Sequence, residues 1–171
     1  MSNSIFIRPA QREHLQEVQA INADSSPGVS ALTSDALDQL FRTASVMWVA
    51  SMDERVVGYL VGFAPGAVYD GEEFAWFRQL GHDFLYVDQI AAKASHRGMG
   101  IGAALYQELQ TYAERNRLVS LTCEVNIEPP NPGSMAFHAR LGFVEIGRLH
   151  TRDGRYVALL RKWLRTAATS K

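Results

Sequence analysis

A glycine-rich turn is the feature of the sequence with the clearest chemical potential. It reads His-Arg-Gly-Met-Gly-Ile-Gly-Ala over residues 96–103, after an expected strand at 84–92 and at the start of an expected helix at 100–115. Glycines let backbone N–H groups approach a ligand, and a helix N-terminus adds unpaired donors and a positive dipole end. Arg97 adds a forked, permanently charged donor. The turn therefore predicts an anion site suited to a phosphate.

Two common phosphate-binding motifs fit this turn poorly. The chain contains no Gly-x4-Gly-Lys-Ser/Thr, so it has no Walker loop. Gly98-x-Gly100-x-x-Ala103 matches the dinucleotide-binding fingerprint loosely, and Glu124 follows about twenty residues later. However, the turn comes late in the chain, and the segment 93–97 separates the strand from the first glycine. A nicotinamide-dependent oxidoreductase therefore stays only as an alternative.

Two carboxylates on expected central strands are candidates for general base chemistry. Asp88 lies on the strand 84–92, and Glu124 lies on the strand expected at 118–126. A buried carboxylate is costly unless it is paired or functional. For each of them a structural role, as a hydrogen-bonded acid that orients a loop, is as well supported as a catalytic one.

Hydrophobic periodicity and turn residues predict an alternation of strands and helices around these positions. The expected strands are 5–9, 46–51, 56–63, 84–92, 118–126, 143–151 and 156–163, and the expected helices are 12–23, one capped by Ser34, 72–80, 100–115 and 134–141. The mixture of hairpins with strand–helix–strand units predicts an α/β fold with a mixed sheet.

Composition narrows the class of protein. The chain has 171 residues and a formal net charge of -1, which argues against a nucleic-acid binder. The single cysteine, Cys123, excludes an internal disulfide and a multi-cysteine zinc site, and we expect it to be a buried structural thiol. We expect no signal peptide and no membrane span, and hence a cytoplasmic protein with one domain at 1–164 and a frayed tail at 165–171.

Two motifs carry a resemblance to a known family. Ile90-Ala-Ala-x-Ala-x-x-Arg97-Gly-Met-Gly100-Ile-Gly102 resembles the pyrophosphate-binding motif of the GCN5-related N-acetyltransferase (GNAT) superfamily. Asn131-Pro-Gly-Ser134-Met-Ala-Phe137-His138-Ala-Arg-Leu-Gly142-Phe143 is similar to the family's later helix and strand start. The resemblance covers nearly the whole chain and implies a GNAT-like fold, with a mostly antiparallel sheet of six or seven strands flanked by helices.

The resemblance implies acetyl-CoA as cosubstrate, no metal, and a set of cofactor-binding residues. The implied residues are Ile90, Ala91, Ala92, Arg97, Gly98, Met99, Gly100, Ile101, Gly102, Ala103, Asn131 and Ser134. Backbone groups of 90–92 would pair with the pantetheine arm, the turn with Arg97 would hold the pyrophosphate, and Asn131 and Ser134 would lie beside the arm.

Acetyl transfer to an amine needs a base, because an aliphatic ammonium has a pKa near ~10.4 and cannot attack until it loses a proton. Asp88 and Glu124 are the candidates. Where the family commonly has a tyrosine as proton donor to the thiolate, this chain has His138, whose imidazole titrates near neutrality. We therefore expect a proton-transfer role for His138, with Tyr86, Tyr106, Tyr112 or water as alternatives.

The acceptor is the least constrained part of the prediction. Aromatic and acidic side chains in 64–83 suit a cationic amine, although a packing helix with a solvated acidic edge explains them equally well. The turn 24–29 is a second expected rim of the acceptor pocket. We predict an N-acetyltransferase in which a small amine or a protein amino group attacks the acetyl group directly. The alternative is a non-catalytic sensor of acyl-CoA. The chain could assemble as a homodimer.

Overall fold

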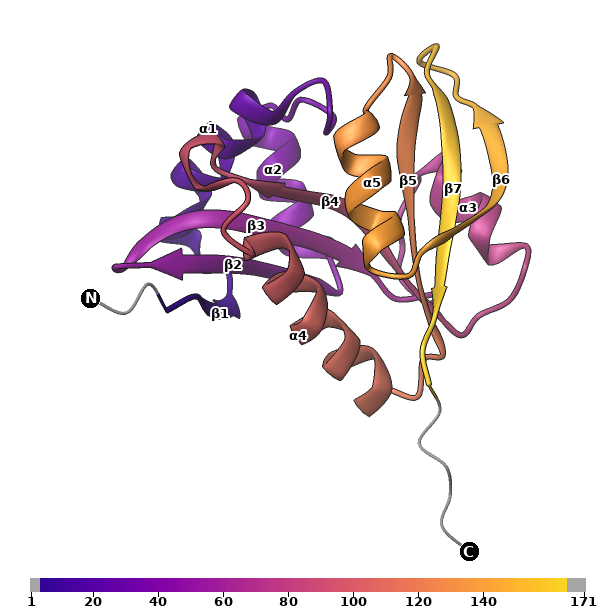
Figure 1. The fold of residues 1–171 in the computed structure, drawn as a ribbon, viewed down its shortest axis with the longest axis horizontal. Coiled ribbons are helices and arrows are strands. Elements are labelled where there is room, and N and C mark those ends of the chain that lie inside the picture. Colours follow the sequence, from indigo (N-terminus) through magenta and orange to yellow (C-terminus); the bar gives the residue numbers. More distant parts are fainter. Residues whose placement is uncertain (1–3, 166–171) are drawn as a thin grey trace, which may run out of the picture.

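The computed structural model describes residues 4–165, which form a seven-stranded sheet with helices on both faces (Figure 1). The strands are β1 (Phe6–Pro9), β2 (Val46–Met52), β3 (Arg55–Phe63), β4 (Phe84–Ala92), β5 (Ser120–Glu128), β6 (Val144–His150) and β7 (Tyr156–Trp163). The helices are α1 (Leu15–Ser25), α2 (Ser34–Thr43), α3 (Glu72–Arg78), α4 (Ile101–Arg115) and α5 (Pro132–Arg140), with single 3-10 turns η1 (Arg12–His14) and η2 (Ala94–His96).

The strand order is β1-β2-β3-β4-β5-β7-β6, and every neighbouring pair is antiparallel except β4 and β5. This arrangement confirms the predicted mixed, mostly antiparallel sheet. It also removes the dinucleotide-binding alternative, because that fold requires a doubly wound parallel sheet. No helix within residues 4–165 combines the length and apolarity needed to cross a membrane.

Several predicted boundaries were wrong by one or two residues. Thr33, not Ser34, caps α2, because its hydroxyl oxygen accepts a hydrogen bond from the Ala36 N–H at 3.1 Å. Helix α5 begins at Pro132, because the side chain of Asn131, the residue just before it, caps the helix N-terminus. Strand β5 begins at 120, since the preceding N–H groups bond to the α4 end and to the loop before β4. Of the predicted tail 165–171, residues 166–171 lie outside the described part of the chain.

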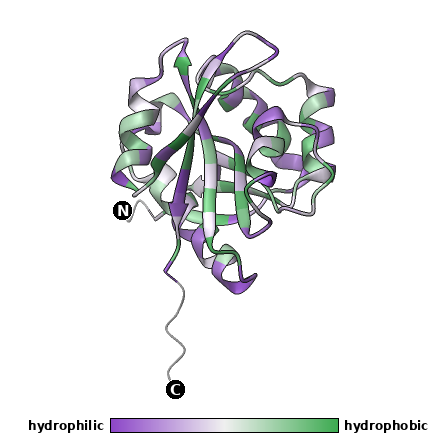
Figure 2. Ribbon diagram, turned by 90° about the vertical axis from the view of Figure 1, so that its right-hand side faces the viewer, coloured by the Kyte–Doolittle hydropathy of each residue, from purple (hydrophilic) through white to green (hydrophobic). Residues whose placement is uncertain are grey.

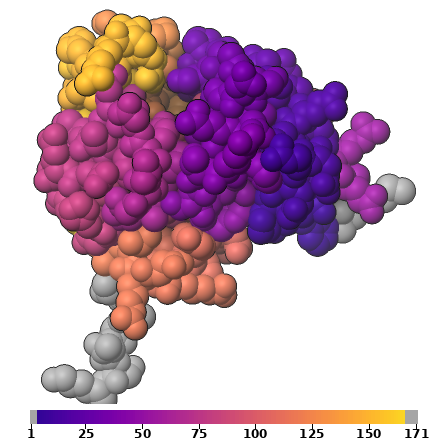
Figure 3. All heavy atoms as spheres, turned by 180° about the vertical axis from the view of Figure 1, so that it is seen from behind, coloured from indigo at the N-terminus to yellow at the C-terminus, as the bar shows by residue number. Residues whose placement is uncertain are grey.

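The sheet separates two apolar cores. Helix α4 packs on one face over side chains of β2 to β5 and β7, while α1, α2 and α3 cover the other face. The central strands are the most hydrophobic ribbons in Figure 2. Seen from behind in Figure 3, the N-terminal helices and the segment around α3 lie side by side over the second face. The functional groups must therefore lie at the ends of the strands or in gaps between them.

Such a gap opens between β4 and β5. Their parallel pairing joins only Phe84–Val87 to Ser120–Cys123, and beyond it β4 stays with β3 while β5 stays with β7. A β-bulge marks the divergence, because Asp88 is skipped between the β3 partners of its two neighbours. In Figure 1 the two strands run apart, with the start of α4 beside β4 and with α5 in front of β5.

A close approach seats the start of α4 on the sheet. A Cβ atom on Gly58 of β3 would lie 2.6 Å from Ile101 Cγ2 and 3.1 Å from the Ala91 carbonyl oxygen. Ile101 is the first residue of α4 and is 1% exposed. The position of the helix N-terminus therefore depends on the absence of a side chain at 58.

We predict that Gly58→Ala lowers the free energy of unfolding by about 1–3 kcal/mol, since the added methyl group displaces a packed helix. Urea denaturation measures the change. The matched control is Gly66→Ala, where a Cβ meets nothing within 4 Å, and its effect should stay within about 0.5 kcal/mol. Equal effects of the two substitutions would contradict the packing argument.

Candidate active site

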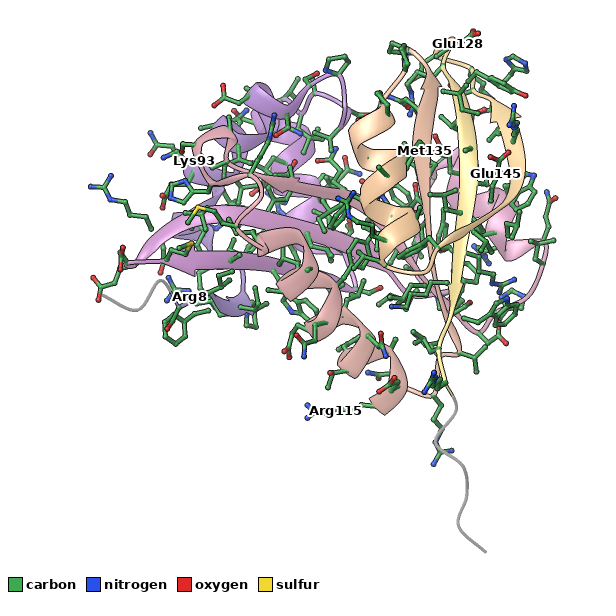
Figure 4. The ribbon with its side chains drawn as sticks, viewed as in Figure 1. Arg8, Lys93, Arg115, Glu128, Met135 and Glu145 are labelled. Carbon is green, nitrogen blue, oxygen red and sulfur yellow. The ribbon has the colours of Figure 1, made fainter. Side chains whose placement is uncertain are left out.

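A cavity of about 470 Å³ opens where β4 and β5 diverge. Its floor comes from the two strands, and its walls come from the connection between α1 and α2, from α2, from the segment before α3, and from α5. The structure brings the three predicted catalytic side chains together, because Asp88, Glu124 and His138 all line this cavity. Figure 4 labels Lys93, just after β4, and Met135 on α5, neither of which lines this cavity.

Asp88 is the bulge residue of β4 and accepts a hydrogen bond from the Tyr69 hydroxyl at 2.6 Å. The Tyr69 ring is stacked on Phe63, with ring centroids 4.0 Å apart, which fixes the hydroxyl over the strand. Burial raises the pKa of Asp88 to about 6, and the nearby Glu73 carboxylate adds to the increase while the Tyr69 hydrogen bond opposes it. This carboxylate can therefore accept a proton near neutral pH.

Glu124 stands on β5 and accepts a hydrogen bond from the Tyr86 hydroxyl at 2.7 Å. Burial raises its pKa well above the ordinary value, and the charges of Glu73 and Asp88 raise it further. The Arg155 guanidinium opposes this effect. Both strand carboxylates are thus held by tyrosine hydroxyls, and both are poised to bind a proton.

His138 lies on α5 and is 3% exposed. Its Nδ1 lies 2.8 Å from the Ser134 carbonyl oxygen, which can only accept, so Nδ1 carries the proton. In the neutral ring Nε2 must then accept, and the Tyr106 hydroxyl lies 2.8 Å from it. Burial lowers the pKa of His138. The ring is therefore neutral at pH 7 in this structure, with both nitrogens engaged.

The other tyrosines considered as proton donors, Tyr86 and Tyr112, lie in different surroundings. Tyr86 already donates to Glu124, and Tyr112 packs edge-on against Trp48, outside the cavity lining. Cys123 is buried, as predicted, and burial raises the pKa of its thiol. Because this thiol lines the cavity yet stays protonated, it offers no thiolate nucleophile.

The glycine-rich turn has the backbone conformation of an anion cradle. Gly98 and Gly100 have φ angles of +75° and +83°, and a Cβ on either would point into open space. No side chain caps the N-terminus of α4 at Gly100, so its first N–H groups face outward. Arg97 is exposed beside the turn, with its Nη2 3.5 Å from Ser25 Oγ. These features fit a pyrophosphate.

The remaining residues predicted to bind the cofactor differ in whether their side chains line the cavity, are exposed or are buried. Ile90 and Ser134 line the cavity, Met99 is 41% exposed, and the Ile101 side chain is buried, so only its backbone can meet a ligand. Asn131 caps α5 by accepting from the Ser134 N–H at 3.2 Å. A Cβ on Gly102 would lie 2.7 Å from Phe137 Cζ, so this third glycine serves the packing of α4 against α5.

In the segment 64–83, some side chains pack in the core and others line the cavity. Phe74 and Phe77 are buried in the core, and a Cβ on Gly147 would overlap the Trp76 ring. In contrast, Tyr69, Asp70 and Glu73 line the cavity. The packing interpretation therefore holds for the aromatic residues of α3, while the contact of this segment with an acceptor stays a prediction.

The connection between α1 and α2 is fixed across the cavity mouth by side chains that the sequence did not single out. The Ser30 carbonyl accepts from Asn22 Nδ2 at 2.9 Å and from Gln89 Nε2 at 3.0 Å. The Pro27 carbonyl accepts from Asn126 Nδ2 at 3.1 Å. These polar residues lie on helices and strands without a motif, so only their convergence in space reveals them.

Arg155 is another residue that the sequence analysis missed. It follows the β6–β7 turn and donates to Glu73 at 2.9 Å, to Asp153 at 2.9 Å and to Asn126 at 3.2 Å. Among residues 4–165 it is the sole basic side chain on the cavity lining apart from the neutral His138. Within residues 4–165 no group of three or more His, Cys, Asp and Glu side chains is placed to hold a metal ion.

Comparison with known proteins agrees with this geometry. A family model described as the acetyltransferase (GNAT) family matches residues 13–143. The chain is 32% identical over 91 residues to L-2,4-diaminobutyric acid acetyltransferase of Nocardia farcinica (strain IFM 10152), which covers 53% of this chain and 39% of that protein. The chain thus spans about two-fifths of the length of this curated relative.

Solved structures share the fold at low sequence identity. Ard1 from Thermoplasma volcanium superposes with a TM-score of 0.76 at 19% identity, covering 94% of this chain and 98% of that one. Arabidopsis thaliana NAA60, solved in complex with acetyl-CoA, gives a TM-score of 0.73 at 17% identity, covering 94% and 98%. At such identities the likeness establishes the fold.

The raised pKa of Asp88 predicts a pH-dependent gain of stability in Asp88→Asn. The pKa of about 6 in the folded protein exceeds the ordinary carboxyl value of 3.8, so ionised Asp88 destabilises the fold increasingly as pH rises between these values. At pH 8 the variant should be more stable by about 1–3 kcal/mol, and the difference should vanish near pH 4. Urea denaturation across pH measures it. Asp53→Asn, in the exposed β2–β3 turn, is the control, and a gain independent of pH would contradict the prediction.

Proposed function

Because the chain belongs to the acetyltransferase (GNAT) family, we propose that it transfers an acetyl group from acetyl-CoA to a primary amine by direct attack. The observation that carries this proposal is the divergence of β4 and β5. Beyond the divergence, one edge of β4 is no longer paired with β5. At one end of this edge lie the two carboxylates of raised pKa on the cavity floor, and its other end leads to the glycine-rich turn. A phosphate cradle and a proton acceptor are thereby joined by one strand.

In this proposal the chain's own groups hold acetyl-CoA, which supplies the acetyl thioester when bound. Backbone N–H groups from Gly98 to Ala103, with Arg97, hold the pyrophosphate. Backbone groups of Ile90 to Ala92 hold the pantetheine arm, because β5 no longer pairs with this part of β4. Asn131 and Ser134 flank the arm from the start of α5. Strand N–H groups at the divergence stabilise charge on the carbonyl oxygen.

The ammonium nitrogen loses two protons on becoming an amide. Asp88 or Glu124 takes the first before attack, directly or through water. The nitrogen–carbon bond then forms, the second proton passes from nitrogen to water, the carbon–sulfur bond breaks, and the sulfur recovers a proton. We assign that proton to His138, with water as the alternative. Because burial lowers the pKa of His138, only a small fraction of the ring is protonated at pH 7. The assignment therefore requires that the imidazolium, although scarce, is the reactive form.

The same site would allow a non-catalytic sensor of acyl-CoA, and the engaged nitrogens of His138 favour this alternative. Calorimetric titration with acetyl-CoA, followed by thiol release against a panel of amines, separates the two. The panel includes L-2,4-diaminobutyrate, since a similar protein carries that name. Binding with release supports the enzyme, and binding without release on any amine supports the sensor.

We further propose that residues 1–164 act as one cytoplasmic acetyltransferase domain on a small amine or a protein amino group. The near-neutral net charge supports the absence of a nucleic-acid or membrane partner. A homodimer through the β6–β7 hairpin is supported by the place of β6 at the edge of the sheet. Size-exclusion chromatography with light scattering tests the assembly.

We predict that Gly100→Glu abolishes acetyl-CoA binding, because its side chain adds bulk and negative charge at the phosphate cradle. Isothermal titration calorimetry measures the loss. Gly100→Asn is the matched control, since Asn tolerates the positive φ at this position and adds no charge. Retained binding in the Glu variant would show that the phosphate lies elsewhere.

His138→Ala should lower kcat by about tenfold or more and leave acetyl-CoA affinity nearly unchanged, if the ring returns the proton. The imidazolium fraction falls as pH rises, so wild-type kcat should decrease between pH 6 and 9 at saturating substrate, while the variant's should not. Steady-state rates across pH provide the measurement. A wild-type kcat that stays constant over this range would assign the proton to water.

A further inference from the structure

The charges that line the cavity do not balance. From the described part of the chain, four carboxylates face it, those of Asp70, Glu73, Asp88 and Glu124, against the single guanidinium of Arg155. That guanidinium is shared, because it also pairs with Asp153, which does not line the cavity. The cavity therefore has a formal deficit of three positive charges when its carboxylates are ionised.

The four carboxylates occupy two levels. Asp88 and Glu124 lie on the strands, and each accepts a hydrogen bond from a tyrosine hydroxyl. Asp70 is exposed on the segment before α3 and makes no hydrogen bond or ion pair with any residue of the described range 4–165. Glu73 is 7% exposed and bridges toward the floor through Arg155. Negative charge thus extends from the floor to the rim.

A single reacting amine cannot compensate this charge during transfer. To attack, the amine must be neutral, so one carboxylate takes its proton and the nitrogen no longer carries charge. The remaining carboxylates would then face an uncharged acceptor. A second ammonium group on the acceptor, a few carbons away, would meet the outer carboxylates while the first nitrogen reacts at the floor.

The cavity mouth combines a fixed backbone segment with apolar side chains. The connection between α1 and α2 is held there by hydrogen bonds from Asn22, Gln89 and Asn126. Val68, which is 95% exposed, lines the cavity together with Asp70. An aliphatic chain would lie against this apolar rim, with charged groups at its ends.

We propose that the acceptor is a compact aliphatic diamine whose second ammonium group is bound by Asp70 and Glu73. This inference rests on the proposed acetyltransferase function. The reaction then acetylates the amine at the strand carboxylates and leaves the second amine charged at the rim. Specificity comes from the unbalanced charge of the cavity.

The test compares acceptors of equal length with the full chain and saturating acetyl-CoA. Initial rates of thiol release are measured for 1,4-diaminobutane, 4-aminobutan-1-ol and 4-aminobutanoate, which differ only in the far group. We expect kcat/KM for the diamine to exceed that for the amino alcohol by about tenfold, and the aminobutanoate to be poorest. The diamine preference should weaken with added salt.

The variant Asp70→Asn should reduce the diamine-to-alcohol ratio by roughly three- to fivefold. Asp53→Asn, which removes an equal charge in the distant β2–β3 turn, should leave the ratio unchanged. A ratio near one in the wild type overturns the inference, as does release with a protein amino group but with no diamine. Release with any amine keeps the proposed function, whereas failure to bind acetyl-CoA removes both.

Discussion

The early end of pairing between β4 and β5 is the constraint on which the rest of the site depends. Four residue pairs hold the two strands in parallel, and the bulge at Asp88 then turns them apart. An interrupted ladder leaves backbone groups in the middle of a sheet without strand partners, which is costly unless a ligand or water pairs with them. The same divergence opens the cavity and places side chains of both strands on its floor. The cavity and the carboxylates on its floor therefore arise from one backbone feature.

The site is maintained at an electrostatic cost. Burial raises the pKa of both strand carboxylates, the charge of Glu73 raises both further, and the charge of Asp88 adds to the increase at Glu124. Tyr69, Tyr86 and Arg155 reduce this repulsion without removing it. A group that binds protons near neutral pH is useful as a base, while its charge opposes folding at higher pH. Stability and reactivity therefore depend on the same side chains in opposite directions.

Rigid packing around the cavity sets the positions of these groups. Gly58 lets Ile101 seat the start of α4 on β3, and Gly102 lets α5 lie close to α4 through Phe137. On the other side, a buried network links Asn22 and Gln89 to the backbone that crosses the cavity mouth. Small residues and buried amides thus fix both walls, so the cavity shape is largely formed before any ligand binds.

The sequence by itself determined the element order, the phosphate-type turn and the candidate carboxylates. These are local properties, because strand and helix periodicity, glycine conformation and helix starts depend on residues close along the chain. The tertiary structure alone decided which polar residues converge: Arg155 reaches Glu73 from a distant hairpin, and Asn126 reaches Pro27 across the gap. It also decided that His138 is buried and neutral beside Tyr106, since hydrogen-bond partners and desolvation depend on packing between elements that no local pattern encodes.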